Sequence, residues 1–197
     1  MSLYYGFSLE KDYLKEENHT YPLIRMSEEP LRCAIAFVKE RFANIPLIGA
    51  EVGVMQGYHS LNILTNIPNI EIFYLVDPYL GSTPFDANED IKNLAKEVLE
   101  NFKEKIRWVY KEFEACTTQD IPDALDFIYI DAKHSYECVK QHLLLSAKLV
   151  KKGGVISGHD FGWTGNGGGV QKAVTEYVSE NKVSLSQEDA DWWFLNS

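Results

Sequence analysis

The chain has 197 residues, with 19 Lys or Arg against 29 Asp or Glu, so its formal net charge is −10 at pH 7. This length predicts a single domain, and 45% hydrophobic residues supply enough apolar side chains for a buried core. The negative charge argues against electrostatic binding to nucleic acid or to an anionic membrane. We therefore expect a small-molecule partner, with no nucleic-acid or membrane contact.

The sequence also indicates a cytoplasmic protein. No apolar run is long enough to cross a bilayer, and the first thirty residues lack the apolar core of a signal peptide. Cys33, Cys116 and Cys138 are far apart in the chain and form no CxxC pair. Free thiols are expected, because neither a disulfide framework nor a zinc site fits this spacing.

The first predicted element is a helix that starts near Ser27 to Pro30, where a hydroxyl, two acids and a proline follow one another. Five short apolar segments then follow, and each is interpreted as a buried strand: residues 47–52, 70–76, 106–110, 125–130 and 155–157. Between them lie stretches with helical spacing: residues 58–66, 86–103 and 135–150. This alternation predicts a parallel sheet flanked by helices.

The end of the chain departs from that alternation. A helix over residues 170–180 precedes two short apolar segments, residues 183–186 and 192–195, which are separated by a polar turn. Two strands so close in sequence predict an antiparallel hairpin. The expected fold class is therefore α/β, a Rossmann-like doubly wound sheet of mostly parallel strands that ends in this hairpin.

A glycine-containing turn follows the first strand. Its sequence is Glu51-Val52-Gly53-Val54-Met55-Gln56-Gly57, after which Tyr58-His59-Ser60 begins a helix. In an open parallel sheet the ligand crevice lies beyond the carboxyl ends of the strands, where the strand order reverses. Glycines allow close backbone approach to a ligand there. The alternative is a turn with only a structural role.

Asp77 ends the second strand, 20 residues after Gly57, at a spacing where a carboxylate can reach a ribose. Followed by Pro78, it is alternatively a simple loop cap. The turn lacks the central glycine of GxGxxG, which disfavours a pyrophosphate, and Glu51 would repel one. An acid at that place suits the ammonium and sulfonium of S-adenosylmethionine. A NAD-dependent oxidoreductase remains an alternative.

Four ordered motifs carry a family resemblance. They are Glu51 to Ser60, Leu75 to Tyr79, the stretch Ile130-Asp131-Ala132-Lys133-His134-Ser135-Tyr136-Glu137, and the stretch from Lys152 to Phe161 that reads KGGVISGHDF. In these motifs the chain resembles the class I S-adenosylmethionine-dependent methyltransferases, and most closely the small-molecule O-methyltransferase-like group related to methyltransferase family 24. The resemblance covers about residues 47 to 180.

The resemblance implies a sheet of seven strands within one domain spanning residues 1–197. Residues 31–197 would form the Rossmann-like core, and residues 1–30 an N-terminal cover. It also implies that Asp77 holds the ribose, that Glu112 and its neighbours face the adenine, and that Asp131 lies near the methionine moiety. The cofactor-binding residues expected on this basis are Glu51, Gly53, Val54, Gly57, Tyr58, Ser60, Asp77, Pro78, Glu112 and Asp131.

Two positions depart from the family pattern, because Ala132 and Lys133 stand where the family has Gly and Asp. Lys133 is a candidate for binding an anionic substrate or for acting as a base if desolvated. A solvent-facing lysine is the alternative.

Polar residues after the fourth and fifth strands are the candidates for catalysis. Methyl transfer needs alignment of donor and acceptor and a base for the acceptor's proton. His134 and His159 both suit that role, and we favour His159 because it follows a glycine-flanked strand end. The same atoms are candidates for a divalent metal site, with Asp131, His159 and Asp160 as ligands. A histidine with two acids suits Mn²⁺, Fe²⁺ or Zn²⁺ better than Mg²⁺; hydrogen-bonded structural residues are the alternative.

Two other segments have open roles. Residues 162–169 read Gly-Trp-Thr-Gly-Asn-Gly-Gly-Gly, which indicates either a lid with Trp163 against the substrate or a flexible connection. The N-terminal aromatic residues form a cover, a homodimer interface or simple packing. His19 and His142 are interpreted as ordinary surface or packing residues.

The expected function is transfer of the methyl group of S-adenosylmethionine to an oxygen, less commonly a nitrogen, of a small molecule. Besides the oxidoreductase, a non-catalytic nucleoside-binding or assembly module with the same fold is a further alternative.

Overall fold

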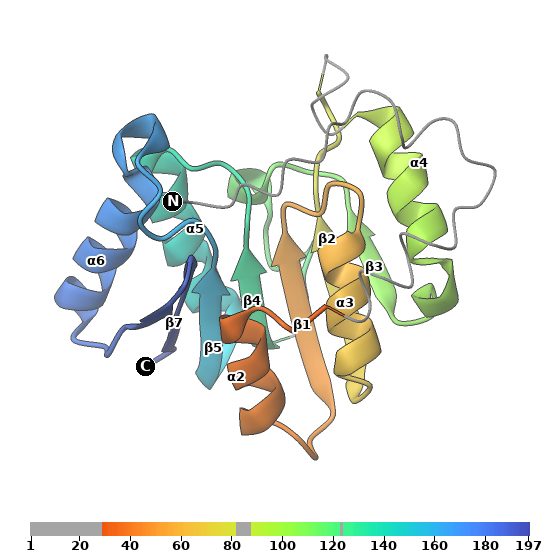
Figure 1. Ribbon diagram of the computed structural model, residues 1–197, viewed down its shortest axis with the longest axis horizontal. Helices are drawn as coiled ribbons and strands as arrows, with labels where there is room; N and C mark the ends of the chain where they lie inside the picture. The colour runs from red at the N-terminus through yellow and green to blue at the C-terminus, as the bar shows by residue number, and fades with distance from the viewer. Residues whose placement is uncertain (1–28, 82–87, 123) are drawn as a thin grey trace.

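A computed structural model describes residues 29–81, 88–122 and 124–197. It contains a seven-stranded sheet in the order β3-β2-β1-β4-β5-β7-β6 (Figure 1). The strands are β1 (Leu47–Val52), β2 (Ile70–Val76), β3 (Ile106–Val109), β4 (Leu125–Ile130), β5 (Val150–Gly158), β6 (Ser186–Glu188) and β7 (Asp191–Leu195). The first five run parallel, and β7 is antiparallel to both β5 and β6. The predicted fold class is confirmed.

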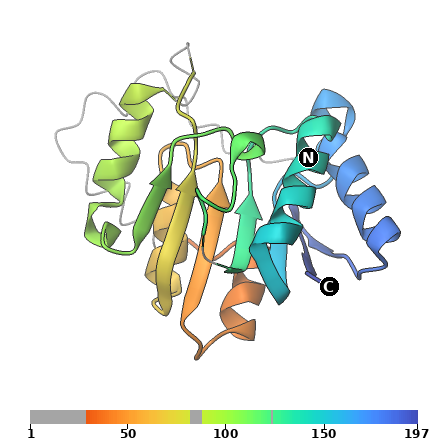
Figure 2. The same ribbon diagram turned by 180° about the vertical axis from the view of Figure 1, so that it is seen from behind.

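Helices cover both faces of this sheet, as the two opposite views show (Figure 1, Figure 2). One face carries α2 (Cys33–Arg41), α3 (Tyr58–Asn66) and α4 (Glu89–Val98), and the other carries α5 (Tyr136–Leu149) and α6 (Gly169–Asn181). Three short 3₁₀ turns complete the described elements: η1 (Glu100–Phe102), η2 (Phe113–Ala115) and η3 (Gly165–Gly167). Each face has its own buried apolar cluster, so the central strands are buried on both sides.

The strand order reverses at β1, which pairs in parallel with both β2 and β4. In this register Val52 lies between Val76 and Ile130, the last residues of the two neighbouring strands. The next residue of each strand is Gly53, Asp77 or Asp131, so three residues from distant parts of the sequence meet at one edge. This is the switch point at which such sheets bind ligands.

Most predicted elements match the structure, and the differences lie at element ends. The first helix begins at Cys33 rather than near Pro30, and Ser27 and Glu28 lie outside the described residues. β5 begins at Val150, five residues earlier than predicted, because its glycine-containing start still pairs with the chain end: Asn196 N donates to Gly154 O at 2.9 Å. The helix predicted over 86–103 is α4 followed by η1, with Asn88 as the N-cap.

The hairpin prediction is confirmed, but its first strand is displaced along the chain. We expected a strand over residues 183–186, whereas β6 begins at Ser186. The reason is that α6 ends late: Lys182 is left-handed, and Val183 N donates to Val178 O at 3.1 Å. None of the described helices is long and apolar enough to span a bilayer.

Candidate active site

The turn after β1 requires glycine at Gly53. Its φ is +87°, and a Cβ placed there would lie 1.9 Å from the carbonyl oxygen of Asp131. Gly57 is also left-handed, with φ +80°, and directly precedes α3. Residues other than glycine rarely adopt this backbone conformation. The turn therefore passes directly against the end of β4.

Asp77 fixes the conformation of that turn. Its Oδ2 accepts hydrogen bonds from the backbone N–H groups of Val54 and Met55, both at 3.0 Å, and its Oδ1 accepts from Tyr79 N at 3.0 Å. The residue is only 4% exposed. Because each carboxylate oxygen has two acceptor sites, Asp77 keeps capacity for one further donor, at Oδ1, such as a ribose hydroxyl.

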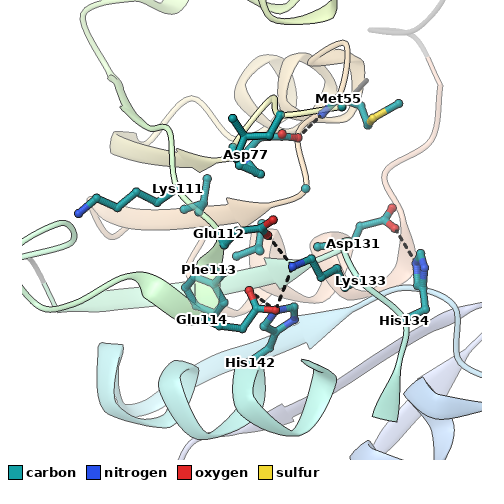
Figure 3. Close-up of a pocket in the computed structure, with 17 residues that line it drawn as sticks. Met55, Asp77, Lys111, Glu112, Phe113, Glu114, Asp131, Lys133, His134 and His142 are labelled. Carbon is teal, nitrogen blue, oxygen red and sulfur yellow. Dashed lines mark hydrogen bonds and ion pairs between the residues drawn. The ribbon is translucent and has the colours of Figure 1, made fainter. Parts of the chain in front are cut away.

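A cavity of about 600 Å³ opens beyond the ends of β1 to β4 (Figure 3). This volume is within the usual range for small-molecule sites. Of the predicted cofactor-binding residues, Gly53, Asp77, Pro78, Glu112 and Asp131 line it, and so do Lys133 and His134. Glu114, one of the neighbours of Glu112 expected to face the adenine, also lines it, as do residues that sequence analysis missed, among them Met55, Leu80 and Lys111.

The other predicted cofactor residues lie behind this wall. Val54 donates its backbone N–H to Asp77. Gly57 is the N-cap of α3, which begins at Tyr58. Glu51 is 1% exposed, and its carboxylate accepts a hydrogen bond from Ser60 Oγ and lies 2.6 Å from His59 Nδ1. Glu51 and Ser60 thus support the turn from inside rather than line the cavity.

Lys133 does not have the environment of a catalytic base. Its Nζ lies 2.8 Å from Glu112 Oε2 and 3.5 Å from Glu114 Oε1. The hydrogen bond to Glu112 raises the pKa of Lys133 above its ordinary value, so the ammonium stays protonated at neutral pH. The base role is predicted only for a desolvated Lys133 and needs a lowered pKa, so this ion pair does not favour it, and the role stays a prediction.

His142 is the clearest functional candidate that sequence analysis missed. We expect a surface or packing residue, and His142 is 1% exposed, as a packing residue is, but it also lines the cavity from α5. It lies on the buried face of α5 with Val139, Ser146 and Leu149. The sequence signal for this position is a histidine at helical spacing among residues that are buried in α5.

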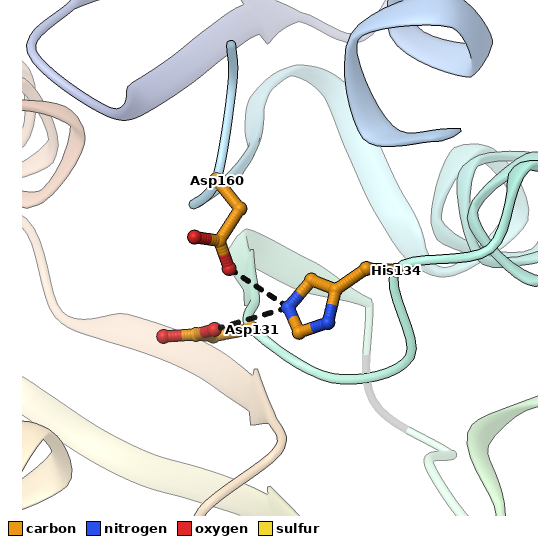
Figure 4. A group of neighbouring side chains, drawn as sticks. All are labelled: Asp131, His134 and Asp160. Carbon is orange, nitrogen blue, oxygen red and sulfur yellow. Dashed lines mark ion pairs between the residues drawn. The ribbon is translucent and has the colours of Figure 1, made fainter. Parts of the chain in front are cut away.

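Three side chains form a compact polar cluster beside the cavity (Figure 4). His134 Nε2 lies 2.8 Å from Asp160 Oδ2 and 3.9 Å from Asp131 Oδ1, and one ligand atom from each residue falls within 4.8 Å of the others. His134 Nε2 is buried at ion-pair distance, yet it makes no hydrogen bond of normal geometry. Two carboxylates around one imidazole nitrogen form a donor set that a divalent metal can use.

The charges in this cluster shift its proton affinities. The carboxylates of Asp131 and Asp160, which lie close to Nε2, raise the pKa of His134 to about 9. Contact with His134, and secondly with His159, holds the pKa of Asp160 well below its usual range. Burial alone would raise the pKa of Asp131, but His134 and Arg32 outweigh it and lower that pKa. These contacts thus favour ionised carboxylates and, when no metal is bound, a protonated His134.

The cluster differs from the predicted metal set, in which His159 stood beside Asp131 and Asp160. The backbone turns directly after β5, with φ +61° at Asp160. His159 Nδ1 lies 3.3 Å from Asp160 Oδ1, whereas it is His134 that approaches both carboxylates. His159 does not line the cavity.

Two further residues contact the cluster. Arg32, just before α2, places its Nη1 2.8 Å from Asp131 Oδ2 and 2.9 Å from Tyr129 Oη. The 99-residue separation between Arg32 and Asp131 left no sequence signal for this pair. The Trp163 ring packs edge-on against the His134 ring, with centroids 5.0 Å apart. The glycine-rich loop therefore contacts the site.

A family model described as "Methyltransferase domain" matches residues 50–161, which is more than half of the chain. The chain belongs to this methyltransferase family. The match contains the glycine turn, Asp77, Asp131 and His134, so the family's motifs coincide with the site. The predicted class I S-adenosylmethionine-dependent methyltransferase is confirmed, and the oxidoreductase alternative is not favoured.

Solved structures share the fold of this methyltransferase. A candidate caffeoyl-CoA O-methyltransferase from Staphylococcus aureus is 15% identical, with a TM-score of 0.68 over 91% of this chain and 93% of that one. An O-methyltransferase from Bacillus cereus, solved with SAH, is 14% identical, with a TM-score of 0.65 over 93% and 94%. CalS11, a TDP-rhamnose 3′-O-methyltransferase of calicheamicin biosynthesis, is 13% identical, with a TM-score of 0.61 over 88% and 91%. No curated protein sequence matches the chain.

Proposed function

We propose that this methyltransferase moves the methyl group of S-adenosylmethionine to an oxygen of a small-molecule acceptor bound at the ends of β4 and β5. One observation carries the proposal: Asp131 and His134 belong both to the cavity and to the polar cluster with Asp160. An acceptor held by the cluster would therefore lie beside the cofactor. CalS11 and the B. cereus protein, both O-methyltransferases, support oxygen as the acceptor atom.

The cavity walls suit the parts of the cofactor. Asp77 is the acceptor for ribose hydroxyls, Glu112 and its neighbours face the adenine, and Gly53 with Asp131 borders the methionine moiety. The bound cofactor supplies a methyl group on a sulfonium. The protein's contribution is alignment, because an in-line displacement requires donor and acceptor in contact and in the correct direction.

A divalent metal fits the same site, held by Asp131, His134 and Asp160 rather than by the set that includes His159. Support comes from His134 Nε2, which is buried among the two carboxylates without a hydrogen bond of normal geometry. Mixed oxygen and imidazole ligands suit Mn²⁺, Fe²⁺ or Zn²⁺ better than Mg²⁺. Such an ion would stabilise an acceptor oxygen as its proton leaves.

His159 is the proposed base, with Asp160 as the carboxylate that orients it at 3.3 Å. His134 is less suited to be the base, because it is the proposed metal ligand and, when no metal is bound, the carboxylates of Asp131 and Asp160 raise its pKa to about 9. Trp163 is proposed to cover the acceptor and limit access of water, since its ring already lies against His134.

The setting of the enzyme is also a proposal. Cys33, Cys116 and Cys138 are free thiols, as expected, which supports a reducing compartment such as the cytoplasm. The acidic net charge supports a small-molecule acceptor over a nucleic acid. The N-terminal cover and the homodimer interface predicted for the first residues lie largely outside the described part of the chain, and both stay proposals.

The test combines binding with turnover. Calorimetric titration should show binding of S-adenosylhomocysteine and none of NAD. Labelled S-adenosylmethionine and a panel of hydroxylated small molecules, assayed with chelator and then with added Mn²⁺ or Mg²⁺, should give a methylated oxygen identified by mass spectrometry. Binding of NAD alone would refute the proposal. Cofactor binding without turnover on any acceptor would favour the non-catalytic module.

A further inference from the structure

An ionic bridge crosses the cavity wall between the segments that follow β3 and β4. Lys133 follows β4 and Glu112 follows β3, and β1 and β2 lie between these two strands in the sheet. Nevertheless Lys133 Nζ lies 2.8 Å from Glu112 Oε2 and 3.5 Å from Glu114 Oε1 (Figure 3). All three residues line the cavity. The lysine at the position that departs from the family pattern thus reaches across the cavity wall to the residues that follow β3.

Glu114 is held from behind as well. His142 Nε2 lies 3.5 Å from Glu114 Oε2, and neither ring nitrogen of His142 makes a hydrogen bond of normal geometry. The Phe113 ring packs edge-on against the imidazole, with centroids 5.4 Å apart. A buried imidazole without a complete hydrogen bond is unfavourable for stability. This points to a role for the His142 imidazole in the cavity wall, beside Glu114, rather than in packing of the core.

The two glutamates depend on Lys133 for their arrangement. Neighbouring carboxylates repel each other, and without a cation they separate or one of them takes a proton. Glu112 has 40% of its side chain exposed, and within the described part of the chain Lys133 is its only ion-pair partner. Loss of the ammonium would therefore free Glu112 to turn away from the cavity.

An ionised carboxylate only accepts hydrogen bonds, so this wall suits a ligand group that donates them. Adenine presents a 6-amino group, whereas a 6-oxopurine presents a carbonyl oxygen at the same place. That oxygen would face a carboxylate oxygen, and two acceptors form no hydrogen bond with each other. Sites built to bind a donor reject analogues that lack it far more strongly than apolar pockets do.

We infer that Lys133 determines nucleobase specificity: it holds Glu112 and Glu114 as acceptors for the 6-amino group of adenine and so selects adenosyl over 6-oxopurine cofactors. This rests on the proposed function for the place of the adenine. Lys133 is a positioning residue that acts through the glutamates, and it belongs to cofactor recognition rather than to acceptor chemistry.

The experiment compares S-adenosylhomocysteine with S-inosylhomocysteine by calorimetric titration of the full chain. The wild type should bind the adenosyl compound at least about tenfold more tightly. Lys133→Met should lose most of that ratio, whereas Lys133→Arg should keep it. The matched control is Lys111→Met, because Lys111 lines the same cavity but pairs with Asp120 at 2.5 Å.

A second variant keeps the test independent of the first. Glu112→Gln offers an amide N–H to a 6-oxo group and should move the ratio toward the inosyl compound, with thermal unfolding as a check on folding. An unchanged ratio in Lys133→Met or Glu112→Gln, or an equal change in Lys111→Met, would overturn the inference while the proposed function stands. If the wild type binds neither nucleoside, the proposed function fails and the inference fails with it.

Discussion

In the proposed cofactor half of the crevice, at the ends of β1, β2 and β3, the turn after β1 is held by a different kind of contact from the polar cluster of the proposed acceptor half, at the ends of β4 and β5. In the cofactor half Asp77 accepts hydrogen bonds from three backbone N–H groups. In the acceptor half the contacts join side chains, namely Arg32 to Asp131 and His134 to Asp160. Backbone contacts preserve a loop shape, whereas side-chain contacts change with each substitution. The first half thus maintains the cofactor site, and the second can vary its chemistry.

The largest effect is expected where the two halves touch. Gly53→Ala would place a Cβ 1.9 Å from the backbone oxygen of Asp131, so the turn or β4 must move. We expect a loss of several kcal/mol of unfolding free energy, on the order of 3 or more, and no measurable binding of S-adenosylhomocysteine. Urea unfolding and calorimetry measure the two quantities.

Gly162→Ala is the matched control for that substitution. Gly162 has φ +88°, nearly the same as Gly53, but a Cβ added there would meet no atom of the described residues within 4 Å beyond its chain neighbours. It should cost only the left-handed strain of about 1 to 2 kcal/mol. Equal losses of unfolding free energy in the two variants would show that backbone strain, and not the contact with the end of β4, explains the requirement for glycine at Gly53.

Asp77→Ala tests the cofactor half alone. It removes the acceptor of three backbone N–H groups and the proposed ribose contact, so affinity for S-adenosylhomocysteine should fall about ten- to a hundredfold. Asp77→Asn keeps one acceptor oxygen, so its affinity should lie between those of the wild type and of Asp77→Ala. The exposed Asp90→Ala carries the same charge change and should bind like the wild type. Unchanged affinity in Asp77→Ala would place the ribose contact elsewhere.

His159→Gln tests the acceptor half alone. If His159 is the base, turnover should decrease by about 10²- to 10⁴-fold. The dissociation constant for S-adenosylhomocysteine should stay within about twofold of wild type, since His159 lies outside the cavity wall. Rate assays and calorimetry on the same preparation separate these quantities. Normal turnover would reassign the base, and a parallel loss of affinity would show that the two halves are not independent.

The smallest expected effect is the pH dependence of stability from His142. Burial lowers the pKa of His142 below its ordinary value of 6.5, so the folded state favours the neutral imidazole and the unfolded state binds more protons. Its stabilising contribution is complete above pH 6.5 and is lost as the pH falls through the lowered folded-state pKa. Urea unfolding between pH 7.5 and pH 5 should show a smaller decrease in His142→Asn than in wild type. Identical slopes would contradict this assignment.

Sequence reasoning predicted the central sheet well because buried parallel strands are continuous apolar runs. The predicted strands at residues 47–52, 70–76 and 125–130 have the bounds of β1, β2 and β4. Asp77 and Gly53 could be predicted to meet, since each follows a strand that ends at the switch point. Predictions were poorer where apolar patterning is weak, as at the glycine-containing start of β5 and at β6.

The acceptor half could be predicted only in part. Asp131, His134 and Asp160 were recognised from motifs, but which histidine approaches both carboxylates depends on how the backbone turns at Asp160, and no pattern encodes that. Arg32 reaches Asp131 across 99 positions, and His142 enters the cavity wall from the middle of a helix. Contacts of this kind come from tertiary packing, and local sequence patterns do not report them.

The close approach of Gly53 to the carbonyl of Asp131 has a consequence for how such an enzyme diverges. Because the glycine turn, which borders the proposed nucleoside site, packs directly against Asp131, which borders the proposed reaction site, the relative position of the two sites is expected to be conserved as the sequence changes. Substitutions around this contact could then change the acceptor without changing the proposed position of the methyl group.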